Sequence, residues 1–290
     1  MTAVAPHKTI EEYLAQAQHL PPAPQVLPQL LRLLGDLETD TREIVDLIAL
    51  DPALTAKVLQ ACNSALLGAA RPASDVADAI QRLGLQAVYR LVAVVNGVRV
   101  LRPRRPIAGF DTADFWRHSV TAALAAQMIA EDRGEDPGVL FTAALLHDLG
   151  KVILTATWAE EYTALLDADP PGGEALAQRE QIRYGLDHAI LGGRLLAHWK
   201  FPAPIIAGVW HHHQPRAAAP FTRHAAIVHL ADAVAHQLEA PPAEGASAVT
   251  PALENVLTLL ALTPDSLLAF AQRTRENFDF VEALCRMSNS

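Results

Sequence analysis

The sequence is poor in cysteine, with only Cys62 and Cys285 among its 290 residues. Two cysteines so far apart imply no disulfide framework and fit a protein of a reducing compartment. The first ten residues lack the apolar core of a signal peptide. No run of about 18 apolar residues, the length needed to cross a membrane, is evident. We therefore expect a soluble, cytoplasmic protein with no membrane partner.

Positive charge is also scarce. Lysine and arginine number 23 against 32 aspartates and glutamates, which gives a formal net charge of -9 and a pI near 5.7. This balance argues against nucleic acid or an anionic membrane as a general partner. With 51% hydrophobic and 19% charged residues the composition is that of a globular protein, long enough for one large or two modest cores.

Alternating apolar and polar runs bounded by turns, the signature of strands, are missing as well. Apolar residues recur instead at spacings of three and four, so we predict an all-α protein. One helix opens at Ser74-Asp75. The other predicted helices are residues 10–18, 26–34, 44–50, 53–67, 85–101, 114–131, 139–157, 174–184, 188–199, 203–212, 221–238, 251–260 and 265–284.

Two prolines and a glycine interrupt the periodicity within residues 102–109. We place the main boundary there. The predicted divisions are an N-terminal helical extension (1–19), an N-terminal helical half (20–105), a helical bundle (106–240) and C-terminal helices (241–290).

The most informative segment is Leu-Leu-His-Asp-Leu-Gly-Lys at residues 145–151. If 139–157 is one helix, Asp148 falls on the same stripe as apolar residues. An ionised carboxylate in such a place costs several kcal/mol unless it has a partner. A divalent cation held by His147 and Asp148 would provide one.

Further candidate ligands follow along the chain. His188 comes after Asp187, a plausible N-cap, and Asp232 shares a predicted helix face with apolar residues. His118 by itself is more often a core or surface histidine, and the run of histidines at 211–213 could simply interact with a helix dipole and solvent. As a set, imidazoles and carboxylates suit zinc, iron or manganese, whereas calcium takes oxygen ligands.

The order of these residues resembles the HD superfamily of metal-dependent phosphohydrolases. Within it the chain is most similar to the HDOD domain, usually associated with bacterial signalling. The N-terminal half carries this second resemblance, which covers roughly residues 20–215. Its motifs are Leu-Pro-Pro-Ala-Pro at 20–24, Ile-Ala-Leu-Asp-Pro-Ala-Leu-Thr-Ala-Lys-Val-Leu at 48–59, Asn-Ser at 63–64 and Ala-Ile-Gln-Arg-Leu-Gly at 79–84.

The resemblance implies a helical bundle with a metal site for one or two ions of iron, manganese or zinc. By resemblance to the superfamily's His-His pair we select the last two of the three consecutive histidines. The implied ligands are His118, His147, Asp148, His188, His212, His213 and Asp232.

The roles of two acidic residues are less clear from the sequence. Asp114 lies four residues before His118, where the related HD-GYP group has a glutamate that helps to hold an additional metal. Aspartate is one methylene shorter, so Asp114 is either a ligand or an acid that favours the helix N-terminus. Glu180 reads as an exposed helix residue or a local hydrogen-bond acceptor rather than a ligand.

If the site is catalytic, the resemblance implies metal-assisted phosphoester hydrolysis with Asp148 and Lys151 in the catalytic machinery. Lys151 would neutralise charge on the phosphate oxygens; otherwise it is a solvated helix lysine. The acid and Gly-Tyr-Pro element that follow the His-His pair in the HD-GYP group are absent here, where Gln214 and Pro215 follow. That departure counts against a cyclic di-GMP phosphodiesterase.

Two functions therefore remain open. The first is a bacterial signalling module that acts through protein partners, with the N-terminal helical half as the partner surface and little or no catalysis. The second is a metal-dependent phosphohydrolase that acts on a nucleotide or cyclic dinucleotide. The sequence predicts no nucleic-acid partner for either.

Overall fold

The computed structural model describes residue 12 and residues 26–34, 39–63, 73–101, 111–167, 173–239 and 249–277. These residues form helices joined by turns and contain no strand, which confirms the all-α prediction. The boundary at 102–109 and all but residue 12 of the predicted helix at 10–18 lie outside the described residues. The last predicted helix, 265–284, was too long, because the structure ends it at Arg275.

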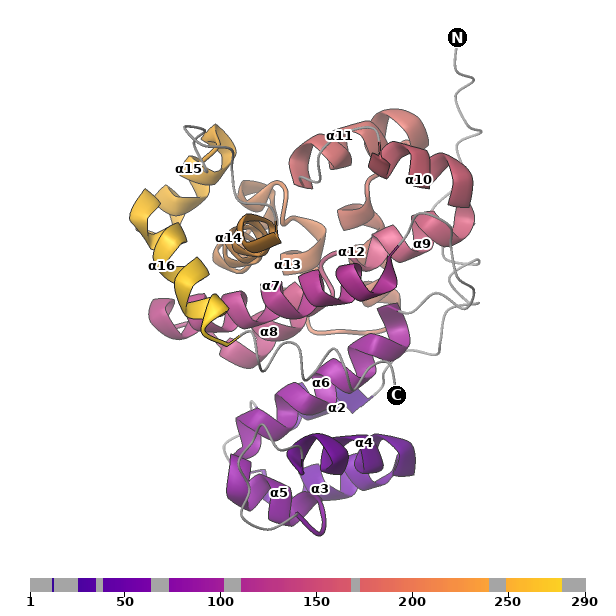
Figure 1. The fold of residues 1–290 in the computed structure, drawn as a ribbon, viewed down its shortest axis with the longest axis vertical. Helices are drawn as coiled ribbons and strands as arrows, with labels where there is room; N and C mark the ends of the chain where they lie inside the picture. Colours follow the sequence, from indigo (N-terminus) through magenta and orange to yellow (C-terminus); the bar gives the residue numbers. More distant parts are fainter. Residues whose placement is uncertain are drawn as a thin grey trace.

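The N-terminal helices form one end of the molecule (Figure 1). Aspartates open several of them: Asp40 and Asp75 accept hydrogen bonds from backbone N–H groups of the first turn, the usual N-cap arrangement. Their buried residues make a shared apolar core. The helices are α2 (Val26–Leu34), α3 (Thr41–Ala49), α4 (Pro52–Cys62), α5 (Val76–Leu83) and α6 (Leu85–Leu101).

Helix α6 connects this end to the rest of the molecule. It packs on α4 and α5 and also on α7 (Thr112–Arg133), α8 (Pro137–Leu145) and α9 (Leu149–Thr157). The approach is close: a Cβ on Gly97 would come within 3.0 Å of the Leu145 side chain. The buried hydroxyl groups of Tyr89 and Thr142 share a hydrogen bond between α6 and α8. The two halves therefore share one continuous core.

The larger group of helices surrounds the predicted site. Helices α7, α8 and α14 pack together at its centre, and α12 packs on both α9 and α13. Helices α15 and α16 lie over α14 (Figure 1). The remaining bounds are α10 (Ala159–Asp167), α11 (Gly173–Tyr184), α12 (His188–His198), α13 (Ala203–Trp210), the 3-10 helix η2 (Pro215–Ala218), α14 (Thr222–Glu239), α15 (Pro251–Leu259) and α16 (Pro264–Arg275).

The predicted helix 139–157 is wrong in one important respect, because the structure divides it at the His-Asp pair. Leu146 and Asp148 have ψ angles of 5° and 7°, outside the helical range, so α8 ends at Leu145 and α9 begins at Leu149. The helix predicted to reach residue 212 likewise ends at Trp210. Helix α10 was not predicted.

One apolar helical stretch, residues 137–157, passes the length and hydropathy test for a membrane span, but 89% of its most apolar window is buried inside the protein. A second candidate, α15 with α16, passes only as a pair bent by 87°. The first stretch is therefore a core helix region of the folded protein.

Gly150, in the first turn of α9, allows α9 to lie directly on the start of α12. A Cβ on Gly150 would stand 2.0 Å from the carbonyl oxygen of His188, an impossible contact. Because the obstacle is backbone rather than a flexible side chain, any larger residue must push α12 away. A glycine is therefore required where His188 enters the site.

We expect Gly150→Ala to lower the free energy of unfolding by about 3 kcal/mol or more, the upper end of overpacking costs. Gly138→Ala is the matched control, because a Cβ there meets its nearest neighbour at 3.4 Å. Denaturant unfolding followed by circular dichroism measures both variants. Equal stabilities for the two variants would contradict the close packing of α9 on α12.

Candidate metal centre

The turn between α8 and α9 holds His147 and Asp148 in the centre of the bundle. The Nδ1 atom of His147 lies 2.7 Å from the carbonyl oxygen of Ala144, so Nδ1 carries the proton and Nε2 presents its lone pair. The Asp148 side chain makes no capping hydrogen bond to α9. Lys151 instead donates to its Oδ2 atom at 2.6 Å. The break in the helix thus turns both side chains toward the site.

His118 and Asp232 complete one side of the cluster. His118 Nε2 lies 3.1 Å from Asp232 Oδ1 and 3.4 Å from His147 Nε2. The Nδ1 atom of His118 faces the carboxylate of Glu239 at 3.0 Å. With both Nδ1 atoms bonded to acceptors, neutral His118 and His147 would direct two lone pairs at each other.

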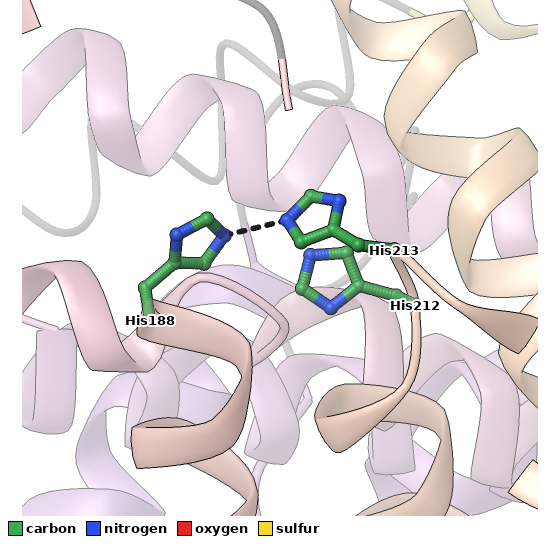
Figure 2. A group of neighbouring side chains, drawn as sticks. All are labelled: His188, His212 and His213. Carbon is green, nitrogen blue, oxygen red and sulfur yellow. Dashed lines mark hydrogen bonds between the residues drawn. The ribbon is translucent and has the colours of Figure 1, made fainter. Parts of the chain in front are cut away.

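His188, His212 and His213 form the other side (Figure 2). The Nε2 atoms of His188 and His213 lie 2.9 Å apart. The Nδ1 atom of His212 donates to the carbonyl oxygen of Val209 at 2.7 Å, and its buried Nε2 makes no hydrogen bond. A buried ring nitrogen without a partner is costly and points to a ligand that the protein itself does not provide.

Glu180 fixes the orientation of His188. It is fully buried, and its Oε2 atom accepts from both the backbone N–H of His188, at 2.8 Å, and Nδ1, at 2.6 Å. The hydroxyl group of Tyr162 donates to its other oxygen. The local-acceptor interpretation of Glu180 therefore fits, and the exposed-residue interpretation was wrong. A carboxylate behind a histidine is a common arrangement around bound metals, where it sets the tautomer of the ligand.

Asp148 stands between the two sides of the cluster. Its Oδ2 atom is 3.5 Å from His147 Nε2, and its Oδ1 atom is 3.3 Å from His188 Nε2. One carboxylate thus lies within reach of both groups of histidines.

Burial and charge define the electrostatics of the cluster. Burial would raise the pKa of Asp148, but His147, Lys151 and His188 hold that pKa well below its usual value. Burial likewise opposes protonation of His118, yet Asp232 and Glu239 raise its pKa to about 10. The pKa of His212 falls well below its usual value through burial and its histidine neighbours. The cluster therefore combines ionised carboxylates with a neutral histidine and attracts positive charge at His118.

These residues fit a divalent transition metal. Nε2 atoms from both sides of the cluster converge. In four of the histidines the Nδ1 atom is bonded to an acceptor, which leaves Nε2 to face the centre. Asp148 and Asp232 are ionised. The mixture of imidazole and carboxylate suits zinc, iron or manganese rather than calcium. A cation between the facing nitrogens of His118 and His147 would take the place of the proton that the raised pKa of His118 keeps there.

The structure brings seven of the predicted site residues together, but not Asp114. Asp114 forms an ion pair with Arg117 at 2.9 Å, with 66% of its side chain exposed, and belongs to none of the groups of candidate ligand atoms found among the described residues. It stands four residues before His118, but at the exposed first turn of α7. The helix-terminus interpretation fits this position. Lys151 lies at the site but is engaged with Asp148.

Two residues at the site were not predicted, His236 and Glu239. Both lie on α14 beyond Asp232, four and seven residues on, so they share its helical face. That spacing could have revealed them, because a carboxylate and two further polar residues recur on a face that otherwise packs in the core. Each contacts a predicted ligand: His236 Nε2 is 3.2 Å from Asp232 Oδ1, and Glu239 holds His118.

A family model of the HDOD domain matches residues 20–215 of this chain. A curated relative, an uncharacterized protein of Treponema pallidum (strain Nichols), is 26% identical over 201 residues, which is 68% of this chain and 38% of the relative. The chain therefore spans little more than a third of that protein.

Several crystal structures share the fold. A candidate phosphohydrolase from Shewanella amazonensis SB2B has a TM-score of 0.72 and 24% identity over 95% of this chain and 97% of its own. An HDOD domain protein of unknown function from Geobacter sulfurreducens has a TM-score of 0.69 and 23% identity over 96% and 98%. A candidate signal transduction protein from Marinobacter aquaeolei VT8 has a TM-score of 0.76 and 20% identity over 100% and 68%. At these identities the likeness shows the fold alone.

Proposed function

Because this chain belongs to the HDOD domain family, whose model matches residues 20–215, we propose that it is a bacterial regulatory module with a divalent-metal centre that acts through protein partners. The observation that carries the proposal is the convergence of buried imidazole nitrogens on Asp148 and Asp232. The named relatives include a candidate phosphohydrolase and a candidate signal transduction protein, so both classes of function have a structural precedent.

Each residue of the centre has a defined task. His118, His147 and Asp232 would hold one ion, and His188, His212 and His213 a second, with Asp148 shared between them. Glu180 and Glu239 orient the histidines, and Lys151 neutralises one oxygen of Asp148. When bound, iron, manganese or zinc supplies positive charge to the carboxylates and, where water can reach it, lowers the pKa of that water.

The burial of the ligands favours regulation over catalysis. His147, Asp148, His188 and His212 are each no more than 2% exposed. A phosphoester substrate would need an opening of its own size to reach these groups. An ion that stabilises the fold, or whose binding signals the metal concentration, would not need one. The ligands that such an ion needs are already assembled.

We expect the purified protein to contain near-stoichiometric iron, manganese or zinc, measured by elemental mass spectrometry. The double variant His147→Ala/Asp148→Ala removes ligands of both ions and should lose the metal. His211→Ala/Asp114→Ala is the matched control, since it also removes one histidine and one aspartate but from outside the cluster, and should retain it. Folded wild-type protein that binds no added metal would refute the metal centre.

The N-terminal helices offer the surface for a protein partner. Leu50, just after α3, is 79% exposed, and it borders an open groove of about 560 Å³ between α2 and α3. Leu33 and Leu47 line the groove together with Leu50, and an apolar patch rimmed by polar residues is typical of a contact surface. The residues that line the groove are Gln29, Arg32, Leu33, Glu43, Asp46, Leu47 and Leu50.

Leu50→Glu should abolish binding of the partner while the metal content stays unchanged. Ile182→Glu is the control, because Ile182 is equally exposed at 78% but lies on α11, far from α3 in Figure 1. Affinity capture from a bacterial lysate with the wild type and both variants, followed by mass spectrometry, compares the bound proteins. If Leu50→Glu captures the same proteins as the wild type, the partner surface lies elsewhere.

A metal-dependent phosphohydrolase is the second candidate. It is favoured by Lys151, whose ammonium group lies 2.6 Å from Asp148 at the centre and whose side chain keeps 12% of its surface exposed. In that function Lys151 would neutralise charge on the phosphate of a nucleotide or cyclic dinucleotide, while Asp148 stays ionised beside it.

We expect metal-replete protein to show no turnover above background on a panel of nucleotides, cyclic dinucleotides and simple phosphodiesters. Turnover by the wild type that falls 100-fold or more in Lys151→Ala would instead support the hydrolase. Loss of one group that stabilises transition-state charge typically lowers kcat by about 10²–10³. Arg117→Ala, which removes an exposed cation outside the cluster, is the control for loss of charge.

A further inference from the structure

The side chain of His236 lies beside Asp232, but one of its ring nitrogens is buried and unsatisfied. Its Nε2 atom is shielded from solvent and finds no hydrogen-bond partner, yet it stands 3.2 Å from Asp232 Oδ1. A histidine retained only to pair with Asp232 would be expected to form a well-directed hydrogen bond. The position instead places a lone pair beside a candidate ligand atom.

Asp232 Oδ1 is surrounded by three imidazole nitrogens. The Nε2 atoms of His118, His147 and His236 lie 3.1, 3.5 and 3.2 Å from it. Ligand atoms that bind one ion with bonds of about 2.0–2.2 Å, at angles of about 90–120°, lie about 3–3.6 Å apart. The 3.4 Å between His118 Nε2 and His147 Nε2 fits the same spacing. Two groups of candidate ligand atoms meet at His118: one adds His147 and Asp232, the other adds His236 and Glu239.

We propose that His236 is a further ligand of the ion held by His118, His147, Asp148 and Asp232, and that it closes this side of the centre against exchangeable water. The proposal rests on the proposed metal centre. With His236 the ion has three nitrogen and two oxygen ligands from the protein. Structural metal sites take all their ligands from the protein, whereas catalytic sites keep a position open for water or substrate.

The exposure of the side chains supports this role. His118 and Asp232 expose 8% and 9% of their side chains, whereas His236 exposes 23% and Glu239 35%. His236 therefore stands between the inner ligands and solvent. Its ring also packs on His118, with ring centroids 4.6 Å apart. A water or phosphate oxygen that approached the ion from this side would have to displace His236.

The test uses the full chain loaded with Co²⁺, whose visible bands report its ligands, and azide as a small anion that binds open metal positions. His236→Ala should bind as much Co²⁺ per chain as the wild type but show a larger, saturable spectral change with azide. Added imidazole should occupy the vacancy and suppress that change. His224→Ala, a histidine of similar exposure at the start of α14, should behave as the wild type.

Any azide response of the ion on the His188 side is common to all three proteins and cancels in the comparison. Identical azide titrations for His236→Ala and the wild type at equal Co²⁺ content would overturn the proposal and leave the metal centre intact. A wild type that binds no Co²⁺ would refute the metal centre itself, so the two failures are distinguishable.

A second measurement does not depend on the folding of a variant. Anomalous diffraction from crystals of the metal-loaded wild type should place an ion about 2.0–2.1 Å from His236 Nε2, the usual bond length to imidazole. An ion bound by His118, His147 and Asp232, with a water where His236 would coordinate, would overturn the proposal.

Discussion

Two carboxylates, Asp148 and Asp232, lie almost fully buried in a helical bundle, and the surrounding structure is arranged to compensate their charge. Only Lys151 contributes a permanent positive charge in direct contact with Asp148 among the described residues. The other neighbours are imidazoles, which carry charge only when protonated or when they share a cation. The bundle can bury two acids because it also gathers the groups that attract positive charge around them.

This requirement explains local details that otherwise look unrelated. The helix is interrupted at residues 146–148, since a continuous helix would direct His147 and Asp148 about 100° apart. Gly150 follows at once, because only a glycine lets the start of α12 approach closely enough for His188 to reach Asp148. Glu180 is buried for the same reason: it holds His188 with its lone pair toward the centre. Each departure from regular helix packing serves the placement of a charged or ligating group.

The sequence predicted much of the helical framework, because apolar periodicity and N-caps are local signals. The bounds of α2 and α6 agree with the prediction at both ends, and Asp187 caps α12 as expected. What could not be predicted depends on three-dimensional contact. The break at the His-Asp pair has no proline to mark it, and the apolar residues on both sides continue the helical pattern. The spacing of His236 and Glu239 from Asp232 places them on one face of α14, but no local pattern shows that this face meets His118 on α7.

The shared helix α6 has a mechanical consequence. Its 17 residues extend about 25 Å. Helix α6 contacts α4 and α5 in the N-terminal group, and it also contacts α9, the helix that begins after Asp148. The same helix therefore belongs both to the packing around the buried centre and to the packing of the N-terminal helices, so a rearrangement on either side must be accommodated at its surface.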